Sequence, residues 1–466
     1  METSRGSRWS SRAGRAAFYG GLVSVFTQAI LLREGLYGQR LAELATGLLL
    51  AGWLLGSGVG AAAGARARRP YRAWGLGMGL MVPVAAGAAL LIRLNALPPF
   101  VCALLPGFLA GAVFVQPFDD LPSGRAYLLE ALGAASGGLI FLLLSQHLLT
   151  PWALAAGLVL AGAVLLASYP PAAPIPLAVL VAAVLLGLPS DMQRMMESVI
   201  PAGDAESRSS PFGEISVVRR QGAPAVYLGG VLIGAAGTPE TAEVSAVVPL
   251  LLARPQSVVY VGYNVETARM LAGWPGVKDV TMVALTDRAL VGFGDDIPLG
   301  VELQTGDGRA WLSGMDETVD LVVVEGGMPL SLAANRFYTR EMFELSSRKL
   351  SPRGLLSFGF HVGENRMLPR DARLVESVLA AGRRSFAAAR AIPLGGALFL
   401  LSRDGSLPVR GDSLAKRLDA CGAETVWLTP GALEAELSPQ RISAFNLHLA
   451  QGSPEEERPL RHAAVR

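Results

Sequence analysis

Apolar segments of membrane-spanning length fill the first part of the chain and constrain its fold more than any other feature. They lie at about 16–33, 43–64, 73–92, 98–117 and 126–148. A hydrocarbon core about 30 Å thick is crossed by roughly 20 helical residues, so these segments have the length of membrane spans. No small-residue cleavage motif follows the first segment and more spans come after it. We therefore interpret it as a membrane helix and not as a signal peptide.

The last apolar stretch of this region is harder to assign. Two runs, 151–168 and 174–189, are separated by Tyr169-Pro170-Pro171. The second run is short for a full crossing, so it spans, re-enters or lies in the interface. We expect a membrane domain of about seven helices over residues 16–189, preceded by a basic tail at 1–15.

Arginines near the helix ends predict an orientation. They gather in the tail and in the second connection, at Arg5, Arg8, Arg12, Arg15, Arg66, Arg68, Arg69 and Arg72. The alternate loops carry only Arg33, Arg40 and Arg93. The positive-inside rule then places the N-terminus in the cytoplasm. With seven spans the C-terminal half lies outside, and with six it lies in the cytoplasm.

Composition excludes several classes of function. The formal net charge of +2 argues against a nucleic-acid partner. Two cysteines, Cys102 and Cys421, are too few for a disulfide framework or a multi-cysteine metal site, and the four histidines show no metal-ligand spacing. We expect no metal ion. One further pattern is structural: glycine recurs every fourth residue at Gly52, Gly56, Gly60 and Gly64, which predicts close packing against another membrane helix.

Beyond the membrane segments the composition becomes that of a soluble protein. We expect a linker at 190–211 and a small β region at 212–236, with 225–233 as one strand. Helices and strands then alternate over 237–405, which predicts a mostly parallel sheet with helices on both faces. A helical extension and tail follow at 406–466.

Candidate ligand-binding residues stand after the expected strands of this domain, because ligands of open α/β sheets bind at the carboxyl ends of strands. The first strand ends at Gly262, followed by Asn264 and Glu266, with one glycine where nucleotide loops usually carry several. Further on, Thr305-Gly306-Asp307-Gly308-Arg309 joins a strand to a helix. Asp307 either accepts a hydrogen bond from an adenine amino group or caps that helix.

Glu325 is the candidate for acid–base chemistry. It stands at the carboxyl end of the expected strand 319–325, where a carboxylate can act as a general base or orient an amine. The alternative is an ordinary solvated or ion-paired loop acid.

Several motifs together carry a resemblance to a known family. They are Leu31-Leu32-Arg33-Glu34, Gly124-Arg125-Ala126-Tyr127, Ser210-Pro211-Phe212-Gly213-Glu214-Ile215, the Gly262 loop, Gly306-Asp307-Gly308-Arg309, and Asn335-Arg336-Phe337-Tyr338-Thr339-Arg340-Glu341-Met342-Phe343. Residues 205–405 resemble the spermidine synthase (polyamine aminopropyltransferase) family. The helices before them resemble the membrane segment of its fused, membrane-bound bacterial branch.

The resemblance implies a Rossmann-like fold of the S-adenosylmethionine methyltransferase type in a bacterial inner-membrane protein. It implies aminopropyl transfer from decarboxylated S-adenosylmethionine, a co-substrate, to an amine, with no tightly bound cofactor. Homodimers are common among the soluble members, so it also suggests a homodimer. Asp307 matches the family's adenine-binding acid and Glu325 its catalytic Asp, one methylene longer. The family's ribose-binding acid is expected near Ala284; Thr286 and Asp287 are close to that position, and Asp287 would need a register slip to take its place.

Other acids of the family pattern are absent from this chain. Met328 stands where a second acid is expected, Leu228-Gly229-Gly230 replaces Leu-Asp-Gly, and Val247 stands near the expected His. A polyamine is multiply charged, so these losses weaken its binding. The alternatives are therefore an aminopropyltransferase-like enzyme with altered activity, and a non-catalytic scaffold that holds a membrane-protein partner in the bilayer. A third hypothesis is that the helical segments form a transporter, which few features of the sequence favour.

Overall fold

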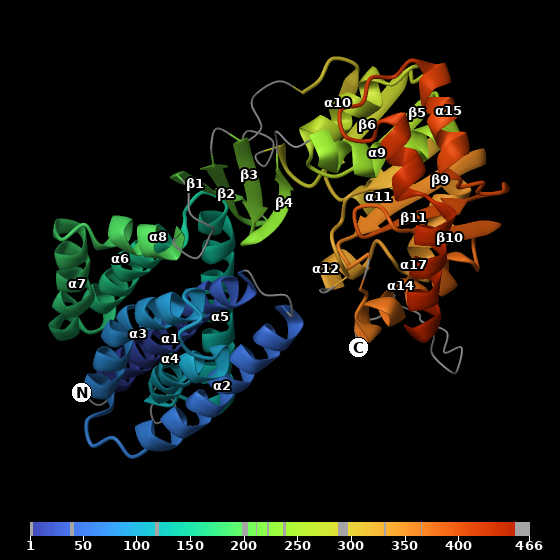
Figure 1. The fold of residues 1–466 in the computed structure, drawn as a ribbon. Coiled ribbons are helices and arrows are strands. Elements are labelled where there is room, and N and C mark those ends of the chain that lie inside the picture. Colours follow the sequence, from blue (N-terminus) through green and yellow to red (C-terminus); the bar gives the residue numbers. More distant parts are fainter. Residues whose placement is uncertain are drawn as a thin grey trace. The chain divides into compact units, whose positions relative to one another are not determined.

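The computed structural model describes residues 3–37, 42–116, 121–197, 204–210, 212–220, 223–235, 239–287, 297–329, 332–364 and 366–452. It divides into two compact units (Figure 1). The helical unit comprises Met1–Val218 and Leu228–Val231, and the α/β unit comprises Arg219–Tyr227 and Leu232–Arg466.

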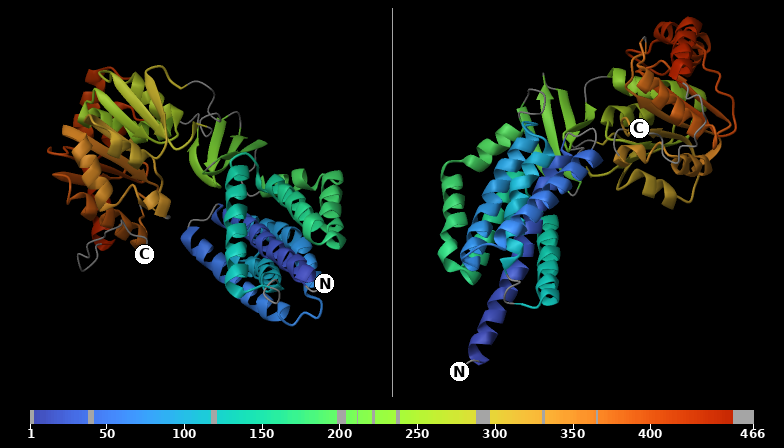
Figure 2. Two further views of the ribbon diagram at one scale, coloured as in Figure 1. Left: turned by 180° about the vertical axis from the view of Figure 1, so that it is seen from behind. Right: turned by 90° about the horizontal axis from the view of Figure 1, so that it is seen from below.

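The helical unit is built from long apolar helices. Its elements are α1 (Thr3–Leu36), α2 (Ala42–Gly64), α3 (Pro70–Arg93), α4 (Pro99–Phe114), α5 (Ser123–Ser145), α6 (Thr150–Ser168), the 3-10 turn η2 (Pro170–Ala172), α7 (Pro174–Leu185) and α8 (Leu188–Glu197). Within the described residues, five helices (α1, α2, α3, α5 and α6) are long and apolar enough to cross a membrane. Helix α4 is shorter, with 16 residues. The segment η2–α7 and helix α8 meet at a bend of 69°. The N-terminal turns of α1 extend beyond its neighbours (Figure 2).

Glycines bring two helix pairs into backbone contact, which confirms the packing role predicted for the glycine stripe. A side chain at Gly52, Gly56 or Gly60 would collide with the backbone of Phe100, Leu104 or Phe108, respectively. These contacts advance in the same direction along both chains, so α2 and α4 run parallel. Helices α1 and α5 pack in the same way through Gly133 and Gly137. Backbone approach of this kind maximises van der Waals contact where no hydrophobic driving force acts between helices.

The outer surface of the helices is apolar, as a lipid-facing surface must be. Large aliphatic side chains are exposed on α2, α5, α6 and α7, among them Leu54, Leu55, Val59, Leu128, Leu132, Leu139, Leu142, Leu143, Leu166, Val181, Val184 and Leu185. A patch of this extent in water would drive aggregation, so it supports membrane insertion of this unit.

The chain crosses the whole bundle between α6 and α8. Tyr169 lies against Gly75, at the beginning of α3. The carbonyl of Met196 accepts a hydrogen bond of 3.4 Å from Nε of Arg93, at the end of the same helix. Gly75 and Arg93 are separated by about 27 Å at 1.5 Å per residue. The segment from η2 to α8 therefore spans the bundle, and the chain leaves it at the end where α1 and α3 finish.

A buried ionic network occupies that end. The guanidinium of Arg93 bonds Oε2 of Glu34 at 3.1 Å and both carboxylate oxygens of Glu214 at 2.7 Å, and its Cζ lies 3.0 Å from the ring centre of Tyr37. The side chains of the three charged residues are at most 2% exposed. Thr150, at the start of α6, donates its hydroxyl proton to Glu34. The network thus fixes the start of β2 to the ends of α1 and α3 and to the start of α6.

A small sheet of order β1-β2-β3-β4 follows, formed by β1 (Asp204–Ser210), β2 (Gly213–Arg220), β3 (Ala223–Leu228) and β4 (Val231–Ala235). The expected linker at 190–211 and the single strand expected at 225–233 both differ from this sheet. The segment 190–211 contains most of α8 and all of β1, whose polar side chains bond across the strands, as Ser207 does with Ser216 at 3.0 Å. The segment 225–233 is two strands, because Gly229 and Gly230 turn the chain with φ of 55° and 78°.

The α/β unit contains a seven-stranded sheet of order β10-β11-β9-β8-β5-β6-β7. Its strands are β5 (Ser257–Val261), β6 (Asp279–Ala284), β7 (Val301–Thr305), β8 (Val319–Val324), β9 (Leu350–Phe360), β10 (Ala388–Ile392) and β11 (Ala397–Ser402). The strands from β9 to β7 are parallel, and β11 runs antiparallel to both of its neighbours. The helices are α9 (Pro239–Ala253), α10 (Val265–Gly273), α11 (Gly308–Gly314), α12 (Leu332–Asn335), α13 (Arg340–Lys349), α14 (Pro369–Gly382), α15 (Gly411–Cys421), α16 (Pro430–Glu436) and α17 (Pro439–Gly452).

Two hydrophobic layers cover the faces of this sheet, because consecutive strand residues point to opposite sides. Val259 and Val261 of β5 belong to the layer with α13 and α14. Val258 and Tyr260 belong to the layer with α9, α10 and α15. The expected fold class is confirmed: a helical region with apolar candidate spans precedes a Rossmann-like α/β domain.

Candidate functional site

The carboxyl ends of β5 and β8 mark the place where the strand order reverses. From β5 the chain adds β6 and β7 on one side of the sheet and then returns to β8 on the other. The amide of Glu325 donates to the carbonyl of Val261 at 2.8 Å, and the amide of Gly262 donates to that of Val283 at 3.2 Å. Glu325 and the Gly262 loop therefore flank the switch point, where open α/β sheets bind their ligands.

Tyr260 fills the space directly beneath the Gly262 loop. Its side chain is fully buried. A Cβ atom on Gly262 would lie 2.5 Å from its hydroxyl oxygen and 2.6 Å from its Cζ. The hydroxyl accepts a hydrogen bond of 2.9 Å from the amide of Asn264. Glycine is thus required at 262 by the tyrosine ring, whatever ligand the loop binds.

The polar residues of the loop begin the next helix. Oδ1 of Asn264 accepts from the amide of Glu266 at 3.0 Å, which makes Asn264 the N-cap of α10, and its side chain is buried. Glu266 forms an ion pair of 2.5 Å with Arg269 one turn on. Both bonds are typical of a helix N-terminus and require no ligand.

Glu325 is held by hydroxyl groups from the elements beside it. Its Oε2 accepts from the Tyr260 hydroxyl at 2.5 Å, and its Oε1 accepts from the Thr267 hydroxyl at 2.9 Å. Burial raises the pKa of Glu325, while hydrogen bonds from Tyr260, Thr267 and Ser245 act in the opposite direction. Burial also raises the pKa of Tyr260, and the neighbouring carboxylate adds to this effect. No cationic group is among these causes, so the carboxylate depends on neutral donors.

Asp307 is likewise engaged within the chain. Its Oδ1 accepts from the amide of Ala310 at 2.8 Å and caps α11, while its Oδ2 pairs with the guanidinium of Arg336. Gly308 is buried against Val261, with no room for a side chain. Of the two roles considered for Asp307, the structure shows the cap, and it adds an ion pair.

The remaining predicted residue is exposed. Asp287 follows β6 and has its neighbour Thr286 at 3.4 Å as a hydrogen-bond donor. The structure thus brings Gly262, Asn264 and Glu325 together around Tyr260. Asp307 lies after β7, with its carboxylate turned to its own helix and to Arg336. No group of three His, Cys, Asp or Glu side chains suited to a metal ion occurs in the described parts of the chain.

Sequence reasoning missed the side chains that occupy this site. Tyr260 is not among the predicted site residues, although an aromatic residue two positions before Gly262 is a signal for close contact. Tyr338 belongs to one of the motifs that carry the resemblance, but no site role is predicted for it. It is fully buried and donates a 2.6 Å hydrogen bond to the carbonyl of Gly327, which fixes the loop after Glu325. Burial raises the pKa of Tyr338, so its hydroxyl stays a donor.

Comparisons with known proteins give structural neighbours only. No family model and no curated protein matches the sequence. A spermidine synthase in complex with the transition-state analogue AdoDATO is 14% identical, with 52% of this chain and 88% of that chain covered and a TM-score of 0.40. The spermidine synthase from Thermotoga maritima is 14% identical, with 52% of this chain and 87% of that chain covered and a TM-score of 0.40. Human methyltransferase-like protein 13 in complex with SAH is 15% identical, with 48% of this chain and 94% of that chain covered and a TM-score of 0.28. At this similarity the neighbours do not bear on the activity of this chain.

Proposed function

We propose that the protein is a membrane-anchored, spermidine synthase-like protein whose α/β domain no longer transfers an aminopropyl group. In this proposal the domain serves as a non-catalytic scaffold for a membrane-protein partner. The observation that carries it is the engagement of the two central carboxylates. Glu325 is bonded to Tyr260 and Thr267, and Asp307 to Arg336 and the α11 backbone.

Aminopropyl transfer needs carboxylates that face the ligands. One must hold or deprotonate the attacking amine, and others attract the cationic donor. For Glu325 to do so, the hydroxyls of Tyr260 and Thr267 must lose their acceptor while still buried, at a cost of about 1–3 kcal/mol each. For Asp307 to bind an adenine amino group through Oδ2, it must release Arg336. Both changes oppose ligand binding in the observed conformation.

The path of the membrane segments supports the same proposal. The chain crosses the bundle between Tyr169 and Met196, so β1 and the following residues leave at the end opposite the N-terminal tail. With arginine-rich segments on the cytoplasmic side, the α/β domain lies outside the cytoplasm. Decarboxylated S-adenosylmethionine is made in the cytoplasm, and a domain outside it has no supply of this co-substrate.

One observation favours a second candidate, aminopropyl transfer with an altered amine. Glu325 stands at the switch point with a raised pKa, which is a feature of general bases. Exposed Asp287 supplies a further carboxylate after the neighbouring strand. In this alternative the co-substrate is decarboxylated S-adenosylmethionine.

A turnover assay separates the two. Purified full-length protein is mixed with decarboxylated S-adenosylmethionine and a panel of di- and polyamines, and 5′-methylthioadenosine is quantified. We expect no release above that of the Glu325→Gln variant. Release that needs an amine and disappears in Glu325→Gln would overturn the scaffold proposal in favour of the transferase.

A further inference from the structure

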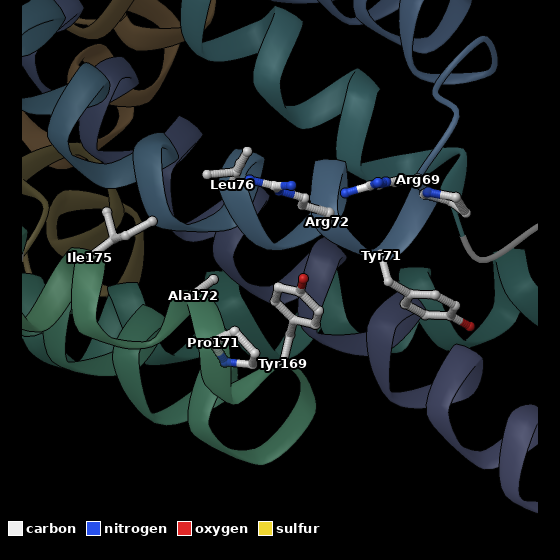
Figure 3. A pocket seen from close by; sticks show the side chains of 9 residues that line it. Arg69, Tyr71, Arg72, Leu76, Tyr169, Pro171, Ala172 and Ile175 are labelled. Carbon is white, nitrogen blue, oxygen red and sulfur yellow. The ribbon is translucent and has the colours of Figure 1, made fainter.

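A pocket of about 590 Å³ opens in the helical unit, between the first turns of α3 and the connection from α6 to α7. It lies at the end of the bundle that carries the connection from α2 to α3. Its lining includes Arg69, Tyr71, Arg72, Leu76, Tyr169 and Ile175 (Figure 3). None of these residues takes part in the site of the α/β domain.

The charged side of this pocket is basic. Arg69 and Arg72 are exposed, and no carboxylate of the described residues forms an ion pair with either. Arg69 is the N-cap of α3 and its side chain makes no cap hydrogen bond. The positive end of a helix of 24 residues therefore adds to two arginines. An anion bound here is stabilised by the two arginines and by the N-terminal end of α3.

The other side of the pocket is apolar and lies deeper along the helix. Leu76 follows Arg72 by four residues, about 6 Å along the α3 axis, and is 44% exposed. Ile175 faces the same space from α7, and Tyr169 stands between the two sides (Figure 3). Tyrosine is typical of the level of lipid head groups, where its ring is in apolar and its hydroxyl in polar surroundings. A ligand that fits both sides has an anionic head and an apolar chain.

We propose that this pocket binds the phosphate head group of an anionic phospholipid, with an acyl chain lying along Leu76 and Ile175. Basic pockets between membrane helices suit such head groups because arginine binds phosphate through several donors at once. Free phosphate shares the head-group chemistry but lacks the chain, so it leaves the apolar side unfilled.

The test uses the full-length protein in phosphatidylcholine nanodiscs that contain a graded fraction of phosphatidylglycerol, with binding read by native mass spectrometry and thermal shift. Arg69→Gln/Arg72→Gln removes the two lining charges. Arg66→Gln/Arg68→Gln is the matched control, because it removes the same charge from the same connection at residues that do not line the pocket. A third variant, Arg69→Lys/Arg72→Lys, keeps the charge.

We expect the wild type to bind phosphatidylglycerol in preference to phosphatidylcholine. Loss of both lining arginines should weaken binding about 30-fold, which corresponds to about 1 kcal/mol for each basic residue. The control should stay within about threefold and the lysine variant should keep most of the affinity. Three results would overturn the proposal: equal binding of both lipids by the wild type, an equal loss in the control variant, or an equal stabilisation by inorganic phosphate alone.

Discussion

Substitution of Glu325 tests whether its carboxylate stabilises the fold. In Glu325→Ala the buried hydroxyls of Tyr260 and Thr267 lose their acceptor. Each unsatisfied group costs about 1–3 kcal/mol, so the α/β domain should lose about 2–6 kcal/mol of unfolding free energy. For a domain of this size that corresponds to a fall in Tm of roughly 5–20 °C. Glutamine is nearly isosteric and retains a carbonyl acceptor, so Glu325→Gln should be far milder.

The pH dependence gives an independent check with a definite sign. Burial raises the pKa of Glu325 above its ordinary value of 4.5, so the folded state binds its proton more tightly than the unfolded state does. The stability from this group is fully present below the unfolded pKa and is lost as the pH rises towards the folded pKa. The loss is about 1.4 kcal/mol for each pH unit between the two pKa values. Glutamine cannot ionise, so Glu325→Gln should gain stability relative to the wild type between pH 4 and pH 8.

Thermal unfolding of the full-length protein in detergent, followed by tryptophan fluorescence at pH 4, 6 and 8, measures both effects. Glu325→Asp is a useful companion variant, because it keeps the charge but shortens the side chain. The reasoning is refuted if Glu325→Ala leaves the Tm unchanged, or if the difference between Glu325→Gln and wild type does not vary with pH.

Three further predictions concern the helical unit. Arg93→Gln leaves Glu34 and Glu214 buried without a cation and should destabilise the unit by about 3–5 kcal/mol, whereas Arg93→Lys should recover part of this, as measured by thermal unfolding in detergent. Gly60→Leu should prevent α2 from packing on Phe108 of α4 and reduce the yield of folded protein, which size-exclusion chromatography would show. A cytoplasm-only fluorescent reporter should be dark at the C-terminus and bright in the α2–α3 connection; the opposite pattern would reverse the proposed orientation.

Local sequence patterns predicted the architecture because its causes are local. Apolar length identified α1, α2, α3, α5 and α6, which are long enough to cross a membrane, whereas the segment expected at 98–117 forms the shorter helix α4. The four-residue spacing of Gly52 to Gly64 identified a packing surface without naming α4 as its partner. Strand composition identified the central strands of the large sheet. The linker at 190–211 was mispredicted in part because β1 is polar: pairing with β2 stabilises it, and pairing is not encoded within the segment itself.

The candidate site was less accessible because its side chains are paired over long sequence separations. Position alone placed Glu325 after a strand, but its acceptor role depends on Tyr260, 65 residues earlier. Asp307 was recognised as a helix cap or an adenine ligand, whereas its pairing with Arg336 depends on how a separate loop returns to the sheet. Arg93 was placed only near a helix end, although two motif residues, Glu34 and Glu214, converge on it.

The central claim is that the switch point of the α/β domain is occupied by the chain's own side chains. It is tested most directly by calorimetric titration of the folded full-length protein with 5′-methylthioadenosine. The account predicts no saturable heat up to millimolar ligand, in the wild type and in Asp307→Ala alike. Saturable binding by the wild type that disappears in Asp307→Ala would contradict it, because Asp307 would then be available to a nucleoside.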